Sequence, residues 1–209
     1  MKKAVLLSIL VVVTLLTVAV MTEAQQADAP VYRDGDWWRI KIDTVRPTGT
    51  SISGPQFGGF PEYIVRFESA NPKVFGIRGE LSKELDAPPI VSVVLGRTGW
   101  RGELVKFPVR VGLTWSDQFQ FQPRGLPMRW EQGRYEVQAW EKIKTPRGEF
   151  DAFKIAMTTT VPTGPKSKGT SSRITTYYYV PEVKAIVSFQ EEGSETNVIS
   201  TLVDFNVGK

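Results

Sequence analysis

After its first 24 residues, the chain contains no stretch that can form a long helix. From residue 36 to residue 207, short runs of alternating apolar and polar residues follow one another, separated by glycine and proline. No window there of about 12 residues, close to the length of an average globular helix, keeps its apolar residues at helical spacing. Alternation with a period of two, between closely spaced turns, predicts strands. We therefore expect an all-β domain, mainly an antiparallel meander that forms a sandwich or a curved, half-barrel-like sheet.

The first 24 residues carry the pattern of a secretory signal. Two lysines precede an uncharged apolar run over residues 4–21, and the small residues Thr22 and Ala24 follow it. This order is typical of a signal peptide that is cleaved after the second small residue. The run is near the lower length limit for a membrane-spanning helix. The alternative to a cleaved signal is therefore an uncleaved membrane anchor, in which case this segment is the part of the chain that contacts a membrane. We expect a signal helix over residues 1–24 and an exported protein, either periplasmic or extracellular.

The rest of the chain reads as a short leader and one domain. Residues 25–35 are polar and include a proline, which predicts a flexible leader ahead of a single all-β domain over residues 36–207. A turn region suggests a sub-boundary near residues 96–106. Within the domain we expect one helical turn over Ser82–Leu85 and a buried strand over Ile90–Leu95, which is rich in β-branched residues.

The composition excludes several classes of enzyme and metal site. The chain contains no histidine and no cysteine, which rules out Ser–His and Cys–His nucleophilic sites, disulfides and the usual zinc sites. It also lacks the glycine-rich motifs that bind phosphates and dinucleotides. The net charge of +4 at pH 7 is modest and the basic residues are scattered, a pattern that does not favour nucleic-acid binding. We expect no metal, no cofactor and no nucleic-acid partner.

A carboxylate pair is the catalytic arrangement that remains open, because glycoside hydrolysis needs only two carboxyl groups at a suitable separation. The candidates are Glu131, Glu136, Glu141, Glu149 and Asp151. The simpler interpretation is that these are solvated charges on a sheet surface, opposite Lys142 and Lys154.

Aromatic residues are better candidates for a binding surface. The six tryptophans are Trp37, Trp38, Trp100, Trp115, Trp130 and Trp140. By alternation, Trp37 points away from Trp38, and Trp140 points away from the face of Tyr135 and Val137. Clustered exposed aromatics mark interaction sites, although large aromatics also dominate ordinary cores. The candidate ligand or partner surface comprises Trp37, Trp100, Trp130, Trp140, Tyr177 and Tyr179.

A run of three tyrosines precedes a short break and a second apolar run. Proline cannot donate to a β-ladder, so pairing stops at Pro181 and a turn over Pro181–Lys184 follows. We expect a β-hairpin over residues 177–191. The outer two tyrosines then share one face, while Tyr178 faces the other layer together with Val180. Packing within the sheet explains these tyrosines more simply than a ligand platform does.

Three strings stand out in the second half of the chain: FPVRVGLTW at 107–115, KTPRGEFDAFKI at 144–155 and TYYYVPEVKAIVSF at 176–189. They resemble a family of bacterial exported proteins of uncharacterised function. In that family a P-L-x-V-G-x-x-W strand entry precedes a P-x-G-x-F-x-A-x-K hairpin and a Y-W-Y-x-P-x-V-G hairpin. This chain has Tyr178 where tryptophan is common and Lys184 where glycine is common. The resemblance covers about half of the chain; it implies an exported β-rich domain and carries over no catalytic residue.

These observations favour an exported, noncatalytic binding or structural module of the cell envelope, whose partner is an envelope protein, a glycan or a lipid. The alternative is a carrier whose curved sheet shelters an apolar ligand such as a lipid. The third function considered is a carboxylate-pair hydrolase. An exposed aromatic patch over a filled core would favour the binding module, an aromatic-lined pocket the carrier, and two converging carboxylates the enzyme.

Overall fold

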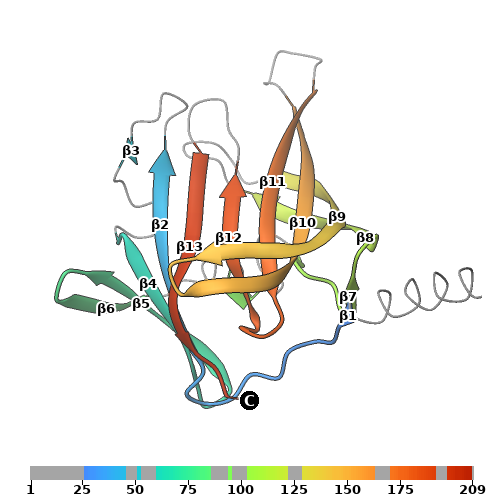
Figure 1. Cartoon of the computed structure of the whole chain (residues 1–209). Coiled ribbons are helices and arrows are strands. Elements are labelled where there is room, and N and C mark those ends of the chain that lie inside the picture. The colour runs from blue at the N-terminus through green and yellow to red at the C-terminus, as the bar shows by residue number, and fades with distance from the viewer. Residues whose placement is uncertain are drawn as a thin grey trace, which may run out of the picture.

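Antiparallel β-strands make up most of the structure, which is a computed structural model of the 209-residue chain (Figure 1). It describes residues 26–45, 51–52, 60–85, 94–95, 103–121, 129–162, 170–191 and 197–208. The expected signal helix over residues 1–24 lies outside these ranges. Within them, no helix has the length and apolar content needed to cross a bilayer.

The strands follow the short apolar–polar runs of the sequence. Their bounds are β1 (Gln26–Ala27), β2 (Trp37–Val45), β3 (Ser51–Ile52), β4 (Glu62–Glu68), β5 (Asn71–Arg78), β6 (Leu81–Leu85), β7 (Val109–Arg110), β8 (Thr114–Phe121), β9 (Arg129–Thr145), β10 (Gly148–Pro162), β11 (Thr170–Val180), β12 (Ala185–Glu191) and β13 (Asn197–Asn206). The predicted all-β class is confirmed.

One curved antiparallel sheet holds all of these strands except β1 and β7. Its order is β6-β5-β4-β2-β13-β12-β11-β10-β9-β8, with β3 paired to the end of β2. The sheet is open, with β6 and β8 at its edges. The last strand, β13, lies between β2 and β12, so the two ends of the domain meet in the middle of the sheet.

The β9–β10 hairpin bends across the rest of the sheet. In Figure 1 it crosses in front of β12 and β13. Phe150 at the start of β10 meets Phe205 of β13, with ring centroids 5.8 Å apart. The sheet therefore folds over itself and buries residues on both of its faces.

Among the described residues, two buried clusters make up the core. The first joins β2, β4 and β13 to the tips of β10, β11 and β12; the second joins β8 and β9 to the same three strands. Neighbouring residues enter different clusters: Ala152 and Val180 belong to the first, Phe153 and Tyr179 to the second. Because successive side chains point to opposite faces of a strand, these strands pack on both faces.

The predicted hairpin over residues 177–191 is confirmed. β11 pairs with β12, and Pro181–Lys184 forms the turn. Tyr178 and Val180 belong to the first cluster, on the opposite face from the two outer tyrosines.

A β-bulge in β9 corrects the predicted orientation of Trp140. Lys154 pairs with Ala139 and Ile155 pairs with Val137, so Gln138 is the extra residue. The bulge shifts the alternation, and Trp140 joins Val137 in the second cluster instead of facing away from it. Its ring packs on Phe153, with centroids 4.4 Å apart.

Two local predictions were wrong. Ser82–Leu85 belongs to strand β6 and does not form a helical turn, because it pairs with β5. In the segment expected to be a strand over residues 90–95, the described residues Val94 and Leu95 are helical, although both are buried as expected.

Part of the segment expected to be a flexible leader is packed against the domain. Gln26 and Ala27 pair with Arg110 and Val109 as β1 and β7. Tyr32 stacks on Phe67, with ring centroids 4.8 Å apart. The polar sequence of this segment hid these contacts, because they depend on partners far away in the chain.

Candidate functional site

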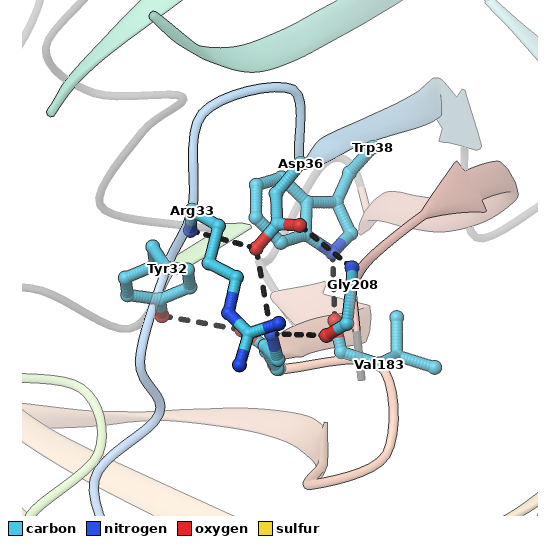
Figure 2. Close-up of polar contacts among 7 residues, drawn as sticks. Tyr32, Arg33, Asp36, Trp38, Val183 and Gly208 are labelled. Carbon is cyan, nitrogen blue, oxygen red and sulfur yellow. Dashed lines mark hydrogen bonds and ion pairs between the residues drawn. The ribbon is translucent and has the colours of Figure 1, made fainter. Parts of the chain in front are cut away.

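Asp36 is a buried carboxylate that ties the two ends of the domain together (Figure 2). It is 2% exposed, and its two oxygens accept hydrogen bonds from the backbone N–H groups of Gly208 at 2.8 Å and Arg33 at 3.0 Å. The ammonium group of Lys184 lies 3.4 Å from Asp36 Oδ2 and donates to the Gly208 carbonyl at 2.7 Å.

Two further bonds hold the β11–β12 turn to the N-terminal segment. Trp38 Nε1 donates to the Val183 carbonyl at 2.7 Å, and the Tyr32 hydroxyl lies 3.2 Å from the carbonyls of Leu95 and Lys184. Figure 2 shows Tyr32, Asp36 and Trp38 converging on this point. The polar groups at this junction bind one another, so we interpret it as a structural tie and not as a ligand site.

A hollow of about 530 Å³ lies on the outer face of β8–β11. Its lining residues are Thr114, Trp115, Ser116, Arg134, Tyr135, Glu136, Gln138, Ala156, Thr158 and Ile174. We call this hollow the trough. Its volume is within the range of small-molecule sites in proteins.

The trough forms where the polar side of four strands faces outward. Along β9, residues 131, 133, 135 and 137 are buried, while residues 130, 132, 134, 136 and 138 are exposed. The same alternation continues on β8 and β11. The outward residues are Thr114, Ser116 and Gln118 on β8; Trp130, Gln132, Arg134, Glu136 and Gln138 on β9; Ala156, Thr158 and Thr160 on β10; and Ser172, Ile174 and Thr176 on β11.

The core fixes the position of these side chains from behind. Trp115 and Tyr135 stack with ring centroids 4.9 Å apart and an interplanar angle of 2°, and the Trp115 indole donates to the Glu103 carbonyl at 3.0 Å. Since Tyr135 lies between Arg134 and Glu136 in the chain, this packing holds the backbone that carries both charged groups.

Arg134 and Glu136 have no ion-pair partner among the described residues, whereas several charges elsewhere on the sheet are paired. Arg134 is opposite Ser116 and Thr158, and Glu136 is opposite Thr114 and Ala156. By contrast, the ion pairs Lys73–Glu68, Lys142–Asp151 and Lys144–Glu149 have N–O distances of 3.1, 3.2 and 3.2 Å. The trough therefore offers one cation and one anion to a ligand.

The structure scatters the aromatic residues predicted to form a surface. Trp130 is 66% exposed on the outer face of β9, whereas Trp37 and Trp140 are half-buried. Tyr177 and Tyr179 are 0% and 1% exposed, so they form part of the core and not of a surface. Trp100 lies outside the described residues.

Burial explains the chemistry of these tyrosines. Removal from water raises the pKa of Tyr177 well above its ordinary value, with a further contribution from nearby Tyr135. Burial also raises the pKa of Tyr179. The Tyr177 hydroxyl donates to the Leu104 carbonyl at 2.5 Å, so it acts as a neutral structural donor.

The candidate carboxylates occupy different surroundings. Glu149 and Asp151 form the exposed ion pairs with Lys144 and Lys142. Glu131 is buried on the inner face of β9, while Glu136 lies on its outer face, in the trough. The sheet thus separates Glu131 from Glu136.

We did not predict the trough from the sequence, although the sequence contains a signal for a polar face at this place. Threonine, serine and glutamine recur at every second position of residues 114–118, and again at 158 and 160 and at 172 and 176. Such alternation predicts a polar face, but the curvature that hollows this face depends on pairing between strands.

Comparison with known proteins finds no matching family model and no matching curated sequence. Solved structures are similar at low identity, and three of them are described here. A predicted lipoprotein of Parabacteroides distasonis has 14% identity and a TM-score of 0.41, over 86% of this chain and 98% of that one. A predicted exported protein with YmcC-like fold from Bacteroides fragilis has 13% identity and a TM-score of 0.39, over 86% and 99%. The hypothetical lipoprotein YmcC of Escherichia coli has 9% identity and a TM-score of 0.41, over 80% and 84%.

Proposed function

We propose that the protein is an exported, noncatalytic binding module of the cell envelope, and that the trough is its ligand site. The observation that carries this proposal is the trough with its unpaired Arg134 and Glu136. Charged groups that lack a partner within the described fold are available to bind an external one. The apolar run and small residues at the N-terminus support export.

Binding without catalysis agrees with the residues that line the trough. Glu136 is the one carboxylate among the described lining residues, and the chain has no histidine or cysteine to serve as a second acid, base or nucleophile. Hydrolysis by a carboxylate pair needs two carboxyl groups flanking the same bond. The lining supports ligand capture better than it supports this reaction.

The carrier alternative has less support. A carrier needs space on the inner side of its curved sheet. On that side, Tyr177, Phe153 and Ile155 are buried and pack with residues of β8 and β9 in the second cluster. The other face of the same strands packs in the first cluster. In this part of the sheet, side chains occupy the position that an apolar ligand would take.

The test fills the trough with a bulky side chain and identifies the copurifying molecules that are lost. Thr158 lines the trough and is half-exposed, so Thr158→Trp fills the space with little effect on the core. Ser82→Trp on the exposed edge strand β6 is the matched control. Each exported protein is purified from the native envelope, and copurifying molecules are identified by mass spectrometry. We expect one class of molecule with the wild type and with Ser82→Trp, and its loss with Thr158→Trp; equal recovery from all three would contradict the proposal.

A further inference from the structure

The outer face of β8–β11 is rich in uncharged hydrogen-bonding groups. Hydroxyl and amide side chains cover it on all four strands: Thr114, Ser116, Gln118, Gln132, Gln138, Thr158, Thr160, Ser172 and Thr176. Hydroxyls donate one bond and accept others, and amides do both through separate atoms. This combination matches a ligand that itself carries many groups able both to donate and to accept.

The charges of the described residues that line the trough cancel. Arg134 and Glu136 are the charged residues among the lining residues, and they lie two positions apart on the same face of β9. A polyanionic ligand is bound by clusters of cations, and the described residues of this face contain no such cluster. A lipid chain needs a largely apolar surface, whereas Ile174 is the one exposed apolar side chain among the described lining residues. The lining therefore favours a neutral, polar ligand.

Trp130 extends the same face beyond the trough. It lies four residues before Arg134 on β9, with Gln132 between them, and all three side chains point outward. At about 3.3 Å per residue, the line from Trp130 to Glu136 is about 20 Å long. An exposed indole offers a flat apolar surface with a polar N–H at its edge.

We infer that the trough and Trp130 bind a neutral glycan, an inference that rests on the proposed function. A sugar ring carries C–H groups on its faces, which pack on an aromatic ring, and hydroxyls at its rim. Trp130 packs against one ring, and the guanidinium of Arg134 and carboxylate of Glu136 bind hydroxyls of rings further along. The length of the face suits a chain of several sugar units.

The experiment measures binding of defined oligosaccharides to the purified exported protein by calorimetry. The probes are maltohexaose, cellohexaose and chitohexaose, with an alginate hexamer and phosphatidylglycerol vesicles as acidic competitors. The variants are Trp130→Ala, Trp130→Phe and Arg134→Ala. The matched controls are Leu81→Ala, at an exposed apolar residue of β6, and Arg66→Ala, at an exposed arginine of β4. Circular dichroism confirms that every variant is folded.

We expect at least one neutral hexasaccharide to bind. Trp130→Ala and Arg134→Ala each weaken that binding by about tenfold or more, as truncation of a central contact does. Trp130→Phe, which keeps an aromatic ring, restores much of it, and both controls bind like the wild type. Binding of none of the three, preference for alginate or vesicles, or equal affinity of all variants would overturn the inference.

The two proposals fail in different ways. If Thr158→Trp loses its copurifying molecule but no neutral oligosaccharide binds, the trough is a binding site and the glycan assignment is wrong. If Thr158→Trp retains everything that the wild type binds, the trough is not the site and both proposals fail.

Discussion

The ammonium group of Lys184 lies 3.4 Å from a carboxylate oxygen of Asp36, a residue 148 positions away in the chain. The backbone of Lys184 is in the left-handed region, with φ of 57°, a conformation that favours glycine. Lysine costs about 1–2 kcal/mol of backbone strain there, which its contacts with Asp36 and Gly208 offset.

Substitutions at this ion pair separate the strain from the contacts. We expect Lys184→Ala to destabilise the protein more than Lys184→Gly, by about 1 kcal/mol, because only glycine relieves the strain. Asp36→Ala removes the acceptor for Lys184 and two backbone N–H groups, so we expect the largest loss, about 3–5 kcal/mol. Urea unfolding measures all three. Equal losses for Lys184→Ala and Lys184→Gly would contradict the role of the backbone conformation.

The three consecutive tyrosines differ in burial, and their alanine variants should differ in stability. Tyr177 and Tyr179 are buried while Tyr178 is half-buried. We therefore expect each outer variant to lose about 3–5 kcal/mol of unfolding free energy, and Tyr178→Ala to lose clearly less. Urea unfolding of Tyr177→Ala, Tyr178→Ala and Tyr179→Ala provides the comparison. Three equal, small losses would show that the hairpin does not pack as described.

Stability should fall at alkaline pH because of the buried tyrosines. The pKa of Tyr177 is higher in the folded protein than the unfolded value of about 10. The contribution of Tyr177 to stability is complete below about pH 10. It is lost as the pH rises toward the folded pKa, because in this range only the unfolded state releases the proton. The slope is at most about 1.4 kcal/mol per pH unit for each such tyrosine.

Tyr177→Phe tests this effect. We expect the substitution to lower the free energy of unfolding by about 1–3 kcal/mol near neutral pH, because the Leu104 carbonyl loses its donor. We also expect stability to decline less steeply above about pH 10 in the variant than in the wild type. Urea midpoints of the wild type and the variant between about pH 8 and 11 measure both effects. The same alkaline slope in both proteins would show that Tyr177 is not responsible.

Two tryptophans of β9 should differ sharply in their effect on stability. Trp130 is 66% exposed, so we expect Trp130→Ala to change the free energy of unfolding by about 0.5 kcal/mol or less. Trp140 packs on Phe153 in the second cluster, and we expect Trp140→Ala to cost about 2–3 kcal/mol. Urea unfolding of both variants measures this difference. A large loss of stability for Trp130→Ala would mean that this indole is part of the core.

Export should remove the first 24 residues and leave the domain intact. Cleavage after Ala24 leaves Gln25 as the first residue, so β1 at Gln26–Ala27 is retained. N-terminal sequencing of the exported protein checks the site. Ala24→Leu replaces the small residue before the cut and should leave the longer, uncleaved form. A wild-type protein that starts at Met1 in the membrane fraction would support the anchor instead.

Local pairing made much of the fold predictable from sequence. The hairpin over residues 177–191 followed from two apolar runs around one proline, because its partners are adjacent in the chain. The orientation of Trp140 was not predictable, since the bulge at Gln138 exists only in relation to its partner strand. Nor was the packing of Tyr32, whose contacts Phe67 and Lys184 come from distant strands and turns.

The candidate site was less predictable than the fold. Trp130 was among the residues expected at a surface, but two others in that group, Tyr177 and Tyr179, are buried. Aromatic residues serve cores and surfaces alike, so residue type alone does not separate them. Arg134 gave no individual signal, because its place beside Thr158 and Ser116 depends on sheet register.

The position of β13 also determines when the domain can be completed. The strands made first, β2 and β4–β6, connect to the rest of the sheet through β13, the last strand of the chain. A chain that is synthesised and threaded through a membrane from its N-terminus must deliver nearly all of its residues before this connection forms. Contacts of such large sequence separation form slowly. For a chain that is exported as we propose, this topology delays closure of the domain until translocation is almost finished. The segment that crosses the membrane is then still unfolded, and the fold does not oppose its passage.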